Sequence, residues 1–422
     1  MTAVLERQGG WRLRLPALLA VAFILIGCGG GSGSAATVAT TAPSTSAVTA
    51  PTAPNAHAVY VDAGPTGSGY NANRLYTNVT LCQGDSASTC QTIPHVLVDT
   101  GSTGLRLLAS VIDPAIKLPA VTSTGGQALL NCVRFVDGSF GWGPVLRATI
   151  RLASKEATGV PIQIMGSPST SALSRACASS GSSEIATVTD LGANGIIGVG
   201  LFKEDCGSAC VSSATIGHYY RCTNAACSAA LPASAPLSNQ VKNPVSLFAS
   251  DNNGIVLDLP SVGLTNRSRL DGLLIFGVGT QPNNQFTGTK VLPTDSLGYI
   301  TATYEGRTLA NSFIDSGSNG LFVDSATLPP CMGIPSFYCP PATTSQSVVL
   351  TGANGTQALI DFTIENAAAS FVGNNPVLPY LVGDFGSTRT FDLGLPFFYG
   401  RKVYFGIEGM NTALGTGPFY AF

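Results

Sequence analysis

Charged residues and histidines are scarce in this sequence. Lys, Arg, Asp and Glu make up 10% of the 422 residues, the formal net charge is -2, and there are three histidines. Ordinary soluble proteins carry about 25% charged residues. So little charge offers no basic surface for nucleic acid or for an acidic membrane, so we expect no nucleic-acid partner. The 26 prolines and 49 glycines favour strands and turns over surface helices.

Motifs of several common enzyme classes are also missing. A serine hydrolase needs a Gly-x-Ser-x-Gly elbow and a paired histidine. The sequence has no such elbow, and no convincing partner is evident for His57, His95 or His218. It also has no phosphate loop, no helix-opening Gly-x-Gly-x-x-Gly and no His-Glu-x-x-His. We therefore expect no cofactor.

The N-terminal segment has the pattern of an export signal. Arg7, Arg12 and Arg14 precede an apolar stretch that is too short to span a membrane as a mature helix, and the tetrapeptide at 25–28 ends in Cys28. This tetrapeptide resembles the bacterial lipobox, which implies a signal peptide at 1–27 and a lipid (palmitate) anchor on Cys28. The alternative is an ordinary thiol after a simple signal peptide.

The residue after Cys28 indicates which membrane would hold the lipoprotein. Gly29 is not the Asp that favours inner-membrane retention, so the resemblance implies a cell-envelope lipoprotein of the outer membrane, on its periplasmic or outer face. Residues 28–58 are rich in Gly, Ser, Thr and Pro and predict a flexible tether between the lipid and the folded part. The expected membrane contact is through the lipid alone.

Ten cysteines remain after Cys28, an even number that suits an oxidising compartment. We expect Cys82 to pair with Cys90 and Cys331 with Cys339, because each pair brackets a short polar loop. Four cysteines between 206 and 227 could be read as a zinc site, but their spacing favours two local disulfides and no metal. The last two can form a longer link. The disulfide candidates are Cys82, Cys90, Cys132, Cys177, Cys206, Cys210, Cys222, Cys227, Cys331 and Cys339.

A twelve-residue pattern at 96–107 recurs at 312–323, with its aspartate 216 residues later (315 minus 99). Each copy runs from an apolar strand into an Asp-Thr/Ser-Gly-Ser turn. Gly permits a close backbone approach, and the Ser three residues after each Asp lies within hydrogen-bonding reach of it. If the turns meet, Asp99 and Asp315 cannot both ionise easily and share a proton. One carboxylate can then accept a proton from water while the other donates one.

These residues resemble the pepsin-like aspartic peptidases. The resemblance implies an all-β, bilobal fold with a cleft between two pseudo-symmetric lobes, at 59–245 and 246–422, and a Cys-rich insertion near 203–238. It implies an aspartic endopeptidase in which Asp99 and Asp315 hold a catalytic water, acting as a monomer on a polypeptide substrate or holding a protein ligand in the cleft. The residues that would support the dyad are Thr100, Gly101, Ser102, Ser316, Gly317 and Ser318.

Other segments fit the same family. Residues 135–143 contain Asp137-Gly138, a hairpin signal, and resemble the flap that closes over substrate. Residues 194–200 and 391–398 resemble the hydrophobic-hydrophobic-Gly elements that thread beside each Asp loop, while 272–277 and 403–407 resemble later strands of the family.

Two positions depart from the family pattern. Arg106 stands where the family has a tryptophan, and Phe135 stands where the flap has a tyrosine. We expect Arg106 to bind Asp137 or to stack on Phe135 or Trp142, and to lower the pKa values of the two aspartates. These departures motivate an alternative function: a non-catalytic, envelope-anchored binding or structural protein with the same fold. The predicted flap and substrate-binding residues are Phe135, Asp137, Gly138, Arg106 and Trp142.

Overall fold

The computed structural model describes residues 53–84, 89–179, 181–263 and 267–422. The predicted signal peptide, the lipidation residue Cys28 and most of the predicted tether lie outside these ranges. The first strand begins at Ala56 and so includes the last residues that we assigned to the tether. Within the described ranges, we find no helix with the length and apolarity needed to cross a bilayer.

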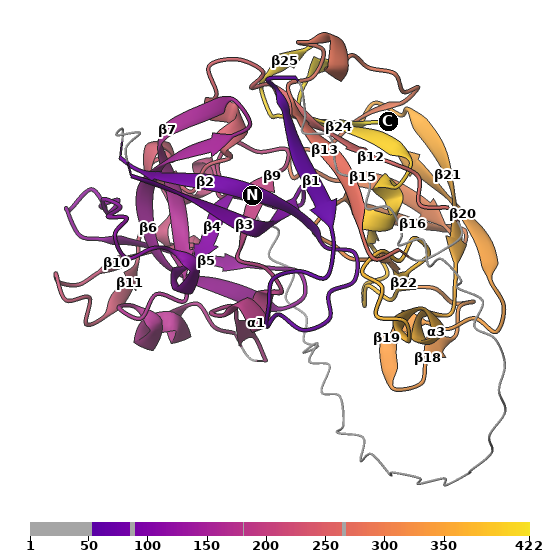
Figure 1. Ribbon diagram of the computed structural model, residues 1–422, viewed down its shortest axis with the longest axis horizontal. Helices are drawn as coiled ribbons and strands as arrows, with labels where there is room; N and C mark the ends of the chain where they lie inside the picture. The colour runs from indigo at the N-terminus through magenta and orange to yellow at the C-terminus, as the bar shows by residue number, and fades with distance from the viewer. Residues whose placement is uncertain (1–52, 85–88, 180, 264–266) are drawn as a thin grey trace, which may run out of the picture.

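The described chain is built almost entirely of β-strands, which confirms the all-β prediction (Figure 1). One large sheet contains β1 (Ala56–Val61), β2 (Leu75–Gln83), β3 (Cys90–Asp99), β4 (Thr103–Leu108), β5 (Leu129–Arg134), β6 (Ser139–Leu152), β7 (Lys155–Met165), β8 (Ser183–Glu184), β9 (Gly195–Val199), β10 (Tyr219–Cys222), β11 (Ala230–Pro232), β12 (Gly254–Leu259), β13 (Leu270–Phe276), β14 (Val291–Pro293), β24 (Arg401–Gly406) and β27 (Phe419–Ala421).

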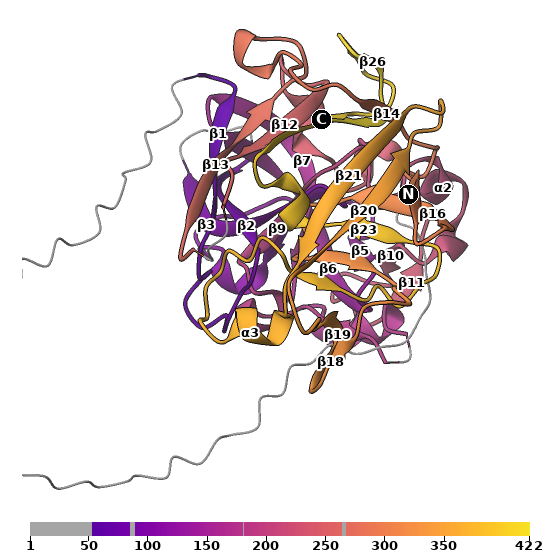
Figure 2. The same cartoon turned by 90° about the vertical axis from the view of Figure 1, so that its right-hand side faces the viewer.

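A second sheet is formed by later strands and ends at one edge in the long β20–β21 hairpin (Figure 2). It contains β15 (Ile300–Tyr304), β16 (Arg307–Ile314), β17 (Leu321–Val323), β18 (Pro330–Cys331), β19 (Ile334–Tyr338), β20 (Thr344–Thr351), β21 (Gln357–Ile364), β22 (Val382–Gly383) and β23 (Phe391–Leu393). A small ribbon pairs β25 (Asn411–Thr412) with β26 (Gly415–Thr416).

Helices in the described residues are short and lie in the connections. The α-helices are α1 (Val188–Leu191), α2 (Ser208–Ser212) and α3 (Ala367–Phe371). Single turns of 3-10 helix occur at Ala109–Val111, Ser171–Ala176, Ala214–Ile216, Leu237–Asn239, Pro244–Leu247, Pro282–Asn284 and Leu395–Phe398.

The larger sheet takes strands from both ends of the described chain. β1 pairs with β2 on one side and with β13 on the other, and β13 continues through β12 to β24 and β27 (Figure 1). Strands on both sides of residue 245 therefore share one hydrogen-bonded sheet. The lobe boundary that we placed there remains a prediction.

A three-strand unit occurs twice. In the first aspartate unit, β3 runs parallel to β9, and β4 returns antiparallel to β9, with Asp99 in register with Gly198. In the second aspartate unit, β16 runs parallel to β23, and β17 returns antiparallel to β23. Each aspartate thus stands at the end of a strand that is paired with its hydrophobic-Gly element.

Burial explains why the sequences of these strands are continuous apolar runs and do not alternate between apolar and polar residues. All five residues of β9 are buried, as are Val96, Leu97 and Val98 of β3. A strand covered on both faces is hydrophobic at successive positions. Val98, Ile197 and Ile314 belong to one core cluster with residues of both units. The strands that position the two turns are therefore packed into a shared core.

The cysteine predictions are confirmed. Cys82 pairs with Cys90, Cys331 with Cys339, and Cys132 with Cys177 across 45 residues. In the Cys-rich segment, Cys206 pairs with Cys210 and Cys222 with Cys227, as two local disulfides. This segment adds β10 and β11 to the edge of the larger sheet beside β5.

Candidate functional site

The two aspartate turns meet, and their carboxylates face each other. Asp99 and Asp315 are 6% and 8% exposed. The backbone N–H of Gly101 donates to Oδ1 of Asp99 at 2.8 Å and to Oδ1 of Asp315 at 2.9 Å. One donor thus bridges two carboxylates that lie 216 residues apart (315 minus 99), and this contact fixes their inner oxygens side by side.

The outer oxygens are held by hydroxyl groups of the same turns. Ser102 donates to Oδ2 of Asp99 at 2.6 Å, and Ser318 donates to Oδ2 of Asp315 at 2.9 Å. The N–H of Gly317 also donates to Oδ1 of Asp315 at 2.7 Å. Each carboxylate is therefore oriented through both of its oxygens, which fixes the planes of the two groups before any ligand binds.

Glycine is required in both turns because the opposite carboxylate occupies the space of a side chain. A Cβ on Gly101 would lie 2.6 Å from Cγ of Asp315. A Cβ on Gly317 would lie 2.7 Å from Oδ1 of Asp99. These distances are well inside van der Waals contact, so any other residue would push the two acids apart.

The residues between each Asp and Gly lock the turns together. The N–H of Ser316 donates to Oγ1 of Thr100 at 2.8 Å, and Oγ of Ser316 donates to the carbonyl of Val98 at 2.8 Å. The N–H of Thr100 donates to Oγ of Ser316 at 3.2 Å. Both side chains are buried. The hydroxyl groups therefore bind across the interface between the turns and hold the carboxylates at a fixed separation.

The electrostatics of the pair favour one shared proton. Burial raises the pKa of Asp315 well above its ordinary value, and the negative charges of Asp99 and Asp392 raise it further. The hydrogen bond from Gly317 acts in the opposite direction, with a smaller effect. Two carboxylates in contact titrate as a pair. The raised pKa of Asp315 is therefore consistent with one proton shared by the two carboxyl groups.

A third buried carboxyl group, Asp392, lies beside the dyad and was missed as a site residue in the sequence. It is 1% exposed and stands on β23, between Phe391 and Leu393. Those two neighbours line a cavity of about 250 Å³ on the other side of the strand, which neither dyad aspartate lines. The available signal was an acidic residue inside an otherwise apolar Phe-Asp-Leu-Gly segment.

Comparison with known proteins gives a family without an assigned activity. Residues 51–422 match the family described as "Protein of unknown function (DUF3443)". The chain belongs to this family. No curated protein matches the sequence.

One of the solved structures that match is the crystal structure of aspartic proteinase from Irpex lacteus. It is 17% identical, the match covers 86% of this chain and 97% of that chain, and the TM-score is 0.45. The chemistry of the present site follows from the contacts of its own two turns.

The predicted partners of Arg106 were wrong. Arg106 is 1% exposed, and Nη2 donates to Oδ2 of Asp205 at 3.0 Å. Asp205 also contacts His218 at 2.8 Å and accepts a hydrogen bond from Tyr219 at 2.5 Å. The guanidinium is therefore neutralised inside the Cys-rich segment, away from Asp137. Our expectation that Arg106 lowers the pKa values of the dyad was also wrong for Asp315, whose pKa is raised.

The Asp137-Gly138 hairpin forms as predicted, between β5 and β6. Asp137 is exposed and accepts hydrogen bonds from the N–H and hydroxyl of Ser139 at 2.9 and 2.6 Å. Phe135 is half-buried and packs against a cluster that includes Leu97 and Ile196. Trp142 differs from the prediction, because it is fully buried and its indole N–H donates to the carbonyl of Thr170 at 2.9 Å. A buried Trp142 presents no surface to a substrate.

The histidines also have partners that the sequence did not reveal. His218 pairs with Asp205, and Nε2 of His57 contacts the carbonyl of Asn78 at 2.8 Å. Nε2 of His95 lies 3.2 Å from Oδ1 of Asp62.

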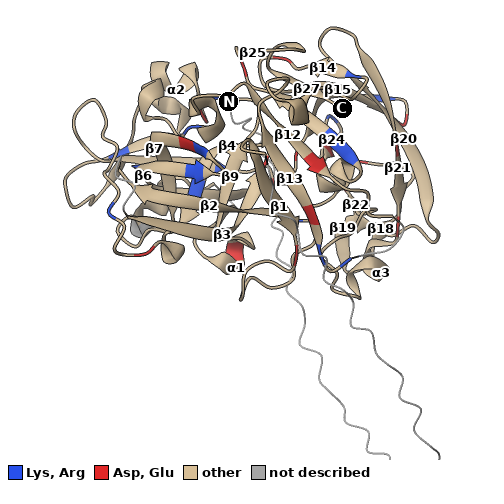
Figure 3. Cartoon of the chain, turned by 45° about the horizontal axis from the view of Figure 1, so that its top comes forward, with Lys and Arg blue, Asp and Glu red and all other residues tan. Residues whose placement is uncertain are grey.

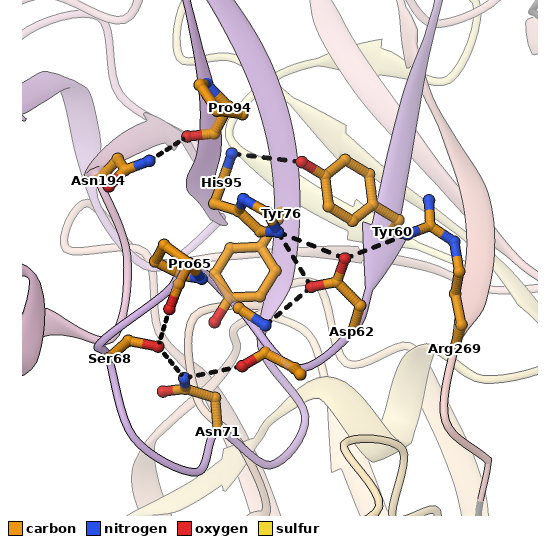
Figure 4. A network of polar contacts seen from close by, with 12 residues as sticks. Tyr60, Asp62, Pro65, Ser68, Asn71, Tyr76, Pro94, His95, Asn194 and Arg269 are labelled. Carbon is orange, nitrogen blue, oxygen red and sulfur yellow. Dashed lines mark hydrogen bonds and ion pairs between the residues drawn. The ribbon is translucent and has the colours of Figure 1, made fainter. Parts of the chain in front are cut away.

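The cluster around Asp62 joins distant segments (Figure 4). Asp62 lies between His95 and Arg269, and the guanidinium of Arg269 stacks on the ring of Tyr60 at 4.7 Å. These contacts tie the ends of β1 and β13 to β3. They support the sheet and do not touch the dyad.

Charged residues are thinly spread along the ribbon (Figure 3). Among the described residues, no group of three or more His, Cys, Asp or Glu side chains is placed to hold a metal ion. The dyad therefore stands in a weakly charged setting, where the charge of one buried carboxylate acts strongly on another.

Proposed function

We propose that this protein hydrolyses peptide bonds with a water molecule held between Asp99 and Asp315. Asp315, which carries the shared proton, acts as the acid, and Asp99 acts as the base. The water oxygen bonds to the scissile carbonyl carbon while Asp99 accepts its proton and Asp315 protonates the carbonyl oxygen. When the C–N bond breaks, Asp99 returns its proton to the amine nitrogen and Asp315 recovers one from the second hydroxyl of the intermediate.

The single observation that carries this proposal is the bridging N–H of Gly101. It donates to both carboxylates at 2.8 and 2.9 Å, so their inner oxygens converge on one point. Ser102 and Ser318 fix the outer oxygens. A structural pair of buried acids has no need of such preorganisation, whereas a hydrolytic pair must be held in a productive geometry.

We further propose that the hairpin around Asp137-Gly138 covers a polypeptide in the site and that Cys28 carries the lipid that holds the chain at the outer membrane. The half-buried Phe135 supports the first idea, because an apolar ring at the hairpin base can contact substrate without a hydroxyl. The five disulfides support an oxidising compartment.

The test is to incubate the full-length chain, in detergent, with a denatured protein from acid to neutral pH. We expect cleavage by the wild type and its loss in Asp99→Asn and Asp315→Asn. Asp361→Asn, at an exposed position of β21, is the matched control and should cleave like the wild type. If the folded wild type cleaves nothing at any pH, or if the dyad variants cleave equally well, the hydrolytic proposal is wrong, and a protein that only binds its ligand becomes the better description.

A further inference from the structure

The cavity of about 250 Å³ beside β23 is an apolar chamber with an open end. Its walls come from the β20–β21 hairpin, from β17 and from β23 (Figure 2). Ser261 and Ser345 line it and are exposed, so the cavity reaches the surface. The buried wall residues are apolar: Leu321, Val348, Ile360, Phe362, Phe391 and Leu393. A small apolar ligand can therefore enter from solvent.

Arg401 of β24 brings a positive charge to this cavity. Its Nη1 donates to the carbonyl of Phe397 at 2.6 Å, and the guanidinium lies 4.8 Å from the centre of the Phe397 ring. In the described ranges Arg401 forms no ion pair, and its Nε and Nη2 have no hydrogen-bond partner. Two donors on one edge of the guanidinium are thus left for a ligand.

The next residue of β24 shows the contrast. Lys402 lies opposite Asp258 of β12, and its Nζ is 3.2 Å from Oδ2 of that acid. Arg401 lies opposite Leu259, so β12 offers it no acid. Two neighbouring cations on one strand therefore differ, because only Lys402 has a countercharge within the chain.

The acid among the described lining residues does not neutralise Arg401. Asp361 is exposed, and its Oδ1 accepts a hydrogen bond from the hydroxyl of Ser347 at 2.6 Å. Burial lowers the pKa of Arg401, and no carboxylate acts to raise it. A half-buried cation without a countercharge favours the binding of an anion.

We propose that this cavity binds a medium-chain fatty acid, with the carboxylate on Arg401 and the tail along Val348, Ile360 and Phe391. The planar guanidinium can hold a carboxylate through two parallel hydrogen bonds, from Nε and Nη2. A cavity of about 150 Å³ holds benzene, with six carbons, so this cavity has room for about ten. Neither dyad aspartate lines it, so the proposal does not depend on hydrolysis.

Photochemical labelling can locate the ligand. The full-length chain in non-ionic detergent is irradiated with a ten-carbon fatty acid that carries a diazirine within its chain, and the labelled peptides are identified by mass spectrometry. We expect the label in residues 345–363 and 391–397, and its loss when decanoate is added in excess. Labelling spread evenly over surface peptides, or labelling that decanoate does not displace, would overturn the proposal.

Variants on β24 test the carboxylate contact. Arg401→Met keeps the apolar stem and should reduce labelling about 10- to 100-fold, because the charged hydrogen bonds are lost. Arg401→Lys keeps the charge and should lose less. Lys402→Met is the matched control and should label like the wild type. Equal labelling in Arg401→Met and the wild type, or an equal loss in Lys402→Met, would contradict a carboxylate on Arg401.

A neutral probe separates charge from packing. A ten-carbon alcohol with the same diazirine should label the wild type at least about tenfold less than the acid and should be indifferent to Arg401→Met. Equal labelling of the wild type by the two probes would mean that the cavity takes any apolar chain, and the fatty-acid proposal would be wrong. This comparison needs only the wild type, so it decides the matter even if thermal melting shows that Arg401→Met does not fold.

Discussion

The two aspartate units can be compared at one pair of residues that lie opposite each other on antiparallel strands. This pair is Arg106 and Ile196 in the first unit, and Phe322 and Asp392 in the second. Each unit places one polar and one apolar residue there, on exchanged strands. Arg106 is neutralised by Asp205, while Phe322 packs on the ring of Phe337 with centroids 5.9 Å apart. The turns themselves do not differ in this way, because each keeps its Asp, Gly and Ser.

This difference separates what the dyad requires from what each half of the chain adds. Gly101 and Gly317 have carboxylates in the space of their side chains, and Ser102 and Ser318 fix the outer oxygens, so both units need the same residues. The cross-strand pair beside each turn only has to pack against its own neighbours, so its residues can differ between the units. In the first unit it anchors the Cys-rich segment, and in the second it brings a third acid to the dyad.

Breaking the buried ion pair between Arg106 and Asp205 should have the largest effect on stability. Asp205→Asn leaves Arg106 buried without a countercharge, so we expect the free energy of unfolding to fall by about 3–5 kcal/mol in urea denaturation. Glu156→Gln removes an exposed ion pair with Arg151 and should cost less than about 1 kcal/mol. Equal losses in the two variants would show that the buried pair does not anchor the segment.

The pH dependence of this loss has a definite sign. Burial alone would raise the pKa of Asp205, but His218, Arg106 and Tyr219 together lower it below the ordinary 3.8. A depressed carboxyl pKa contributes stability that is present above pH 3.8 and is lost as the pH falls through the lower, folded-state value. The difference between wild type and Asp205→Asn should therefore shrink only in strong acid.

Forcing the two turns apart should affect both units alike. Gly101→Ala and Gly317→Ala each place a methyl group against the opposite carboxylate, and we expect a loss of about 1–3 kcal/mol in thermal unfolding and of about 100-fold in cleavage rate. Gly333→Ala is the control, because it has free space for a methyl group while its positive φ of 84° strains any side chain. It should cost stability and leave cleavage unchanged. Unchanged cleavage in the first two variants would contradict the close approach of the acids.

Removing the hydroxyl groups of Thr100 and Ser316, which join the two turns, should lower the free energy of unfolding by a smaller amount, and the two losses should be coupled. Ser316→Ala and Thr100→Val remove hydrogen bonds across the same interface and should each cost about 1–2 kcal/mol in chemical denaturation. Because the residues bind each other, the double variant should lose less than the sum. Ser347→Ala, whose hydroxyl binds the exposed Asp361, is the control. Strict additivity would mean that the two hydroxyls act independently.

The smallest effect is expected at the Asp62 cluster, which does not touch the dyad. Asp62→Asn should cost about 0.5 kcal/mol at neutral pH, because the Arg269 side chain is 47% exposed and solvent screens the pair. Burial acts to raise the pKa of Asp62, but His95, Gly64 and Arg269 lower it on balance. The cost should therefore persist above pH 3.8 and be lost as the pH falls through the lower, folded-state pKa. A loss as large as that of Asp205→Asn would contradict the ranking.

Local signals in the sequence were sufficient for much of the structure. The paired aspartate turns were visible because one pattern is repeated, and Cys82–Cys90 and Cys331–Cys339 because each spans eight residues. The partner of Arg106 was hidden, since Asp205 lies 99 residues away and only folding of the Cys-rich segment joins them. Asp392 was hidden for another reason. Its burial near Asp315 depends on how β23 is placed in the fold, and composition does not reveal that.

The most direct test of the paired acids is a titration of the aspartate carboxyl carbons by NMR, in the wild type and in Asp99→Asn. The charge of Asp99 is one cause of the raised pKa of Asp315, so removing it should lower the pKa of Asp315 toward its ordinary value. If Asp315 titrates at the same pH in both proteins, the two carboxyl groups do not share a proton, and the proposed hydrolysis loses its basis.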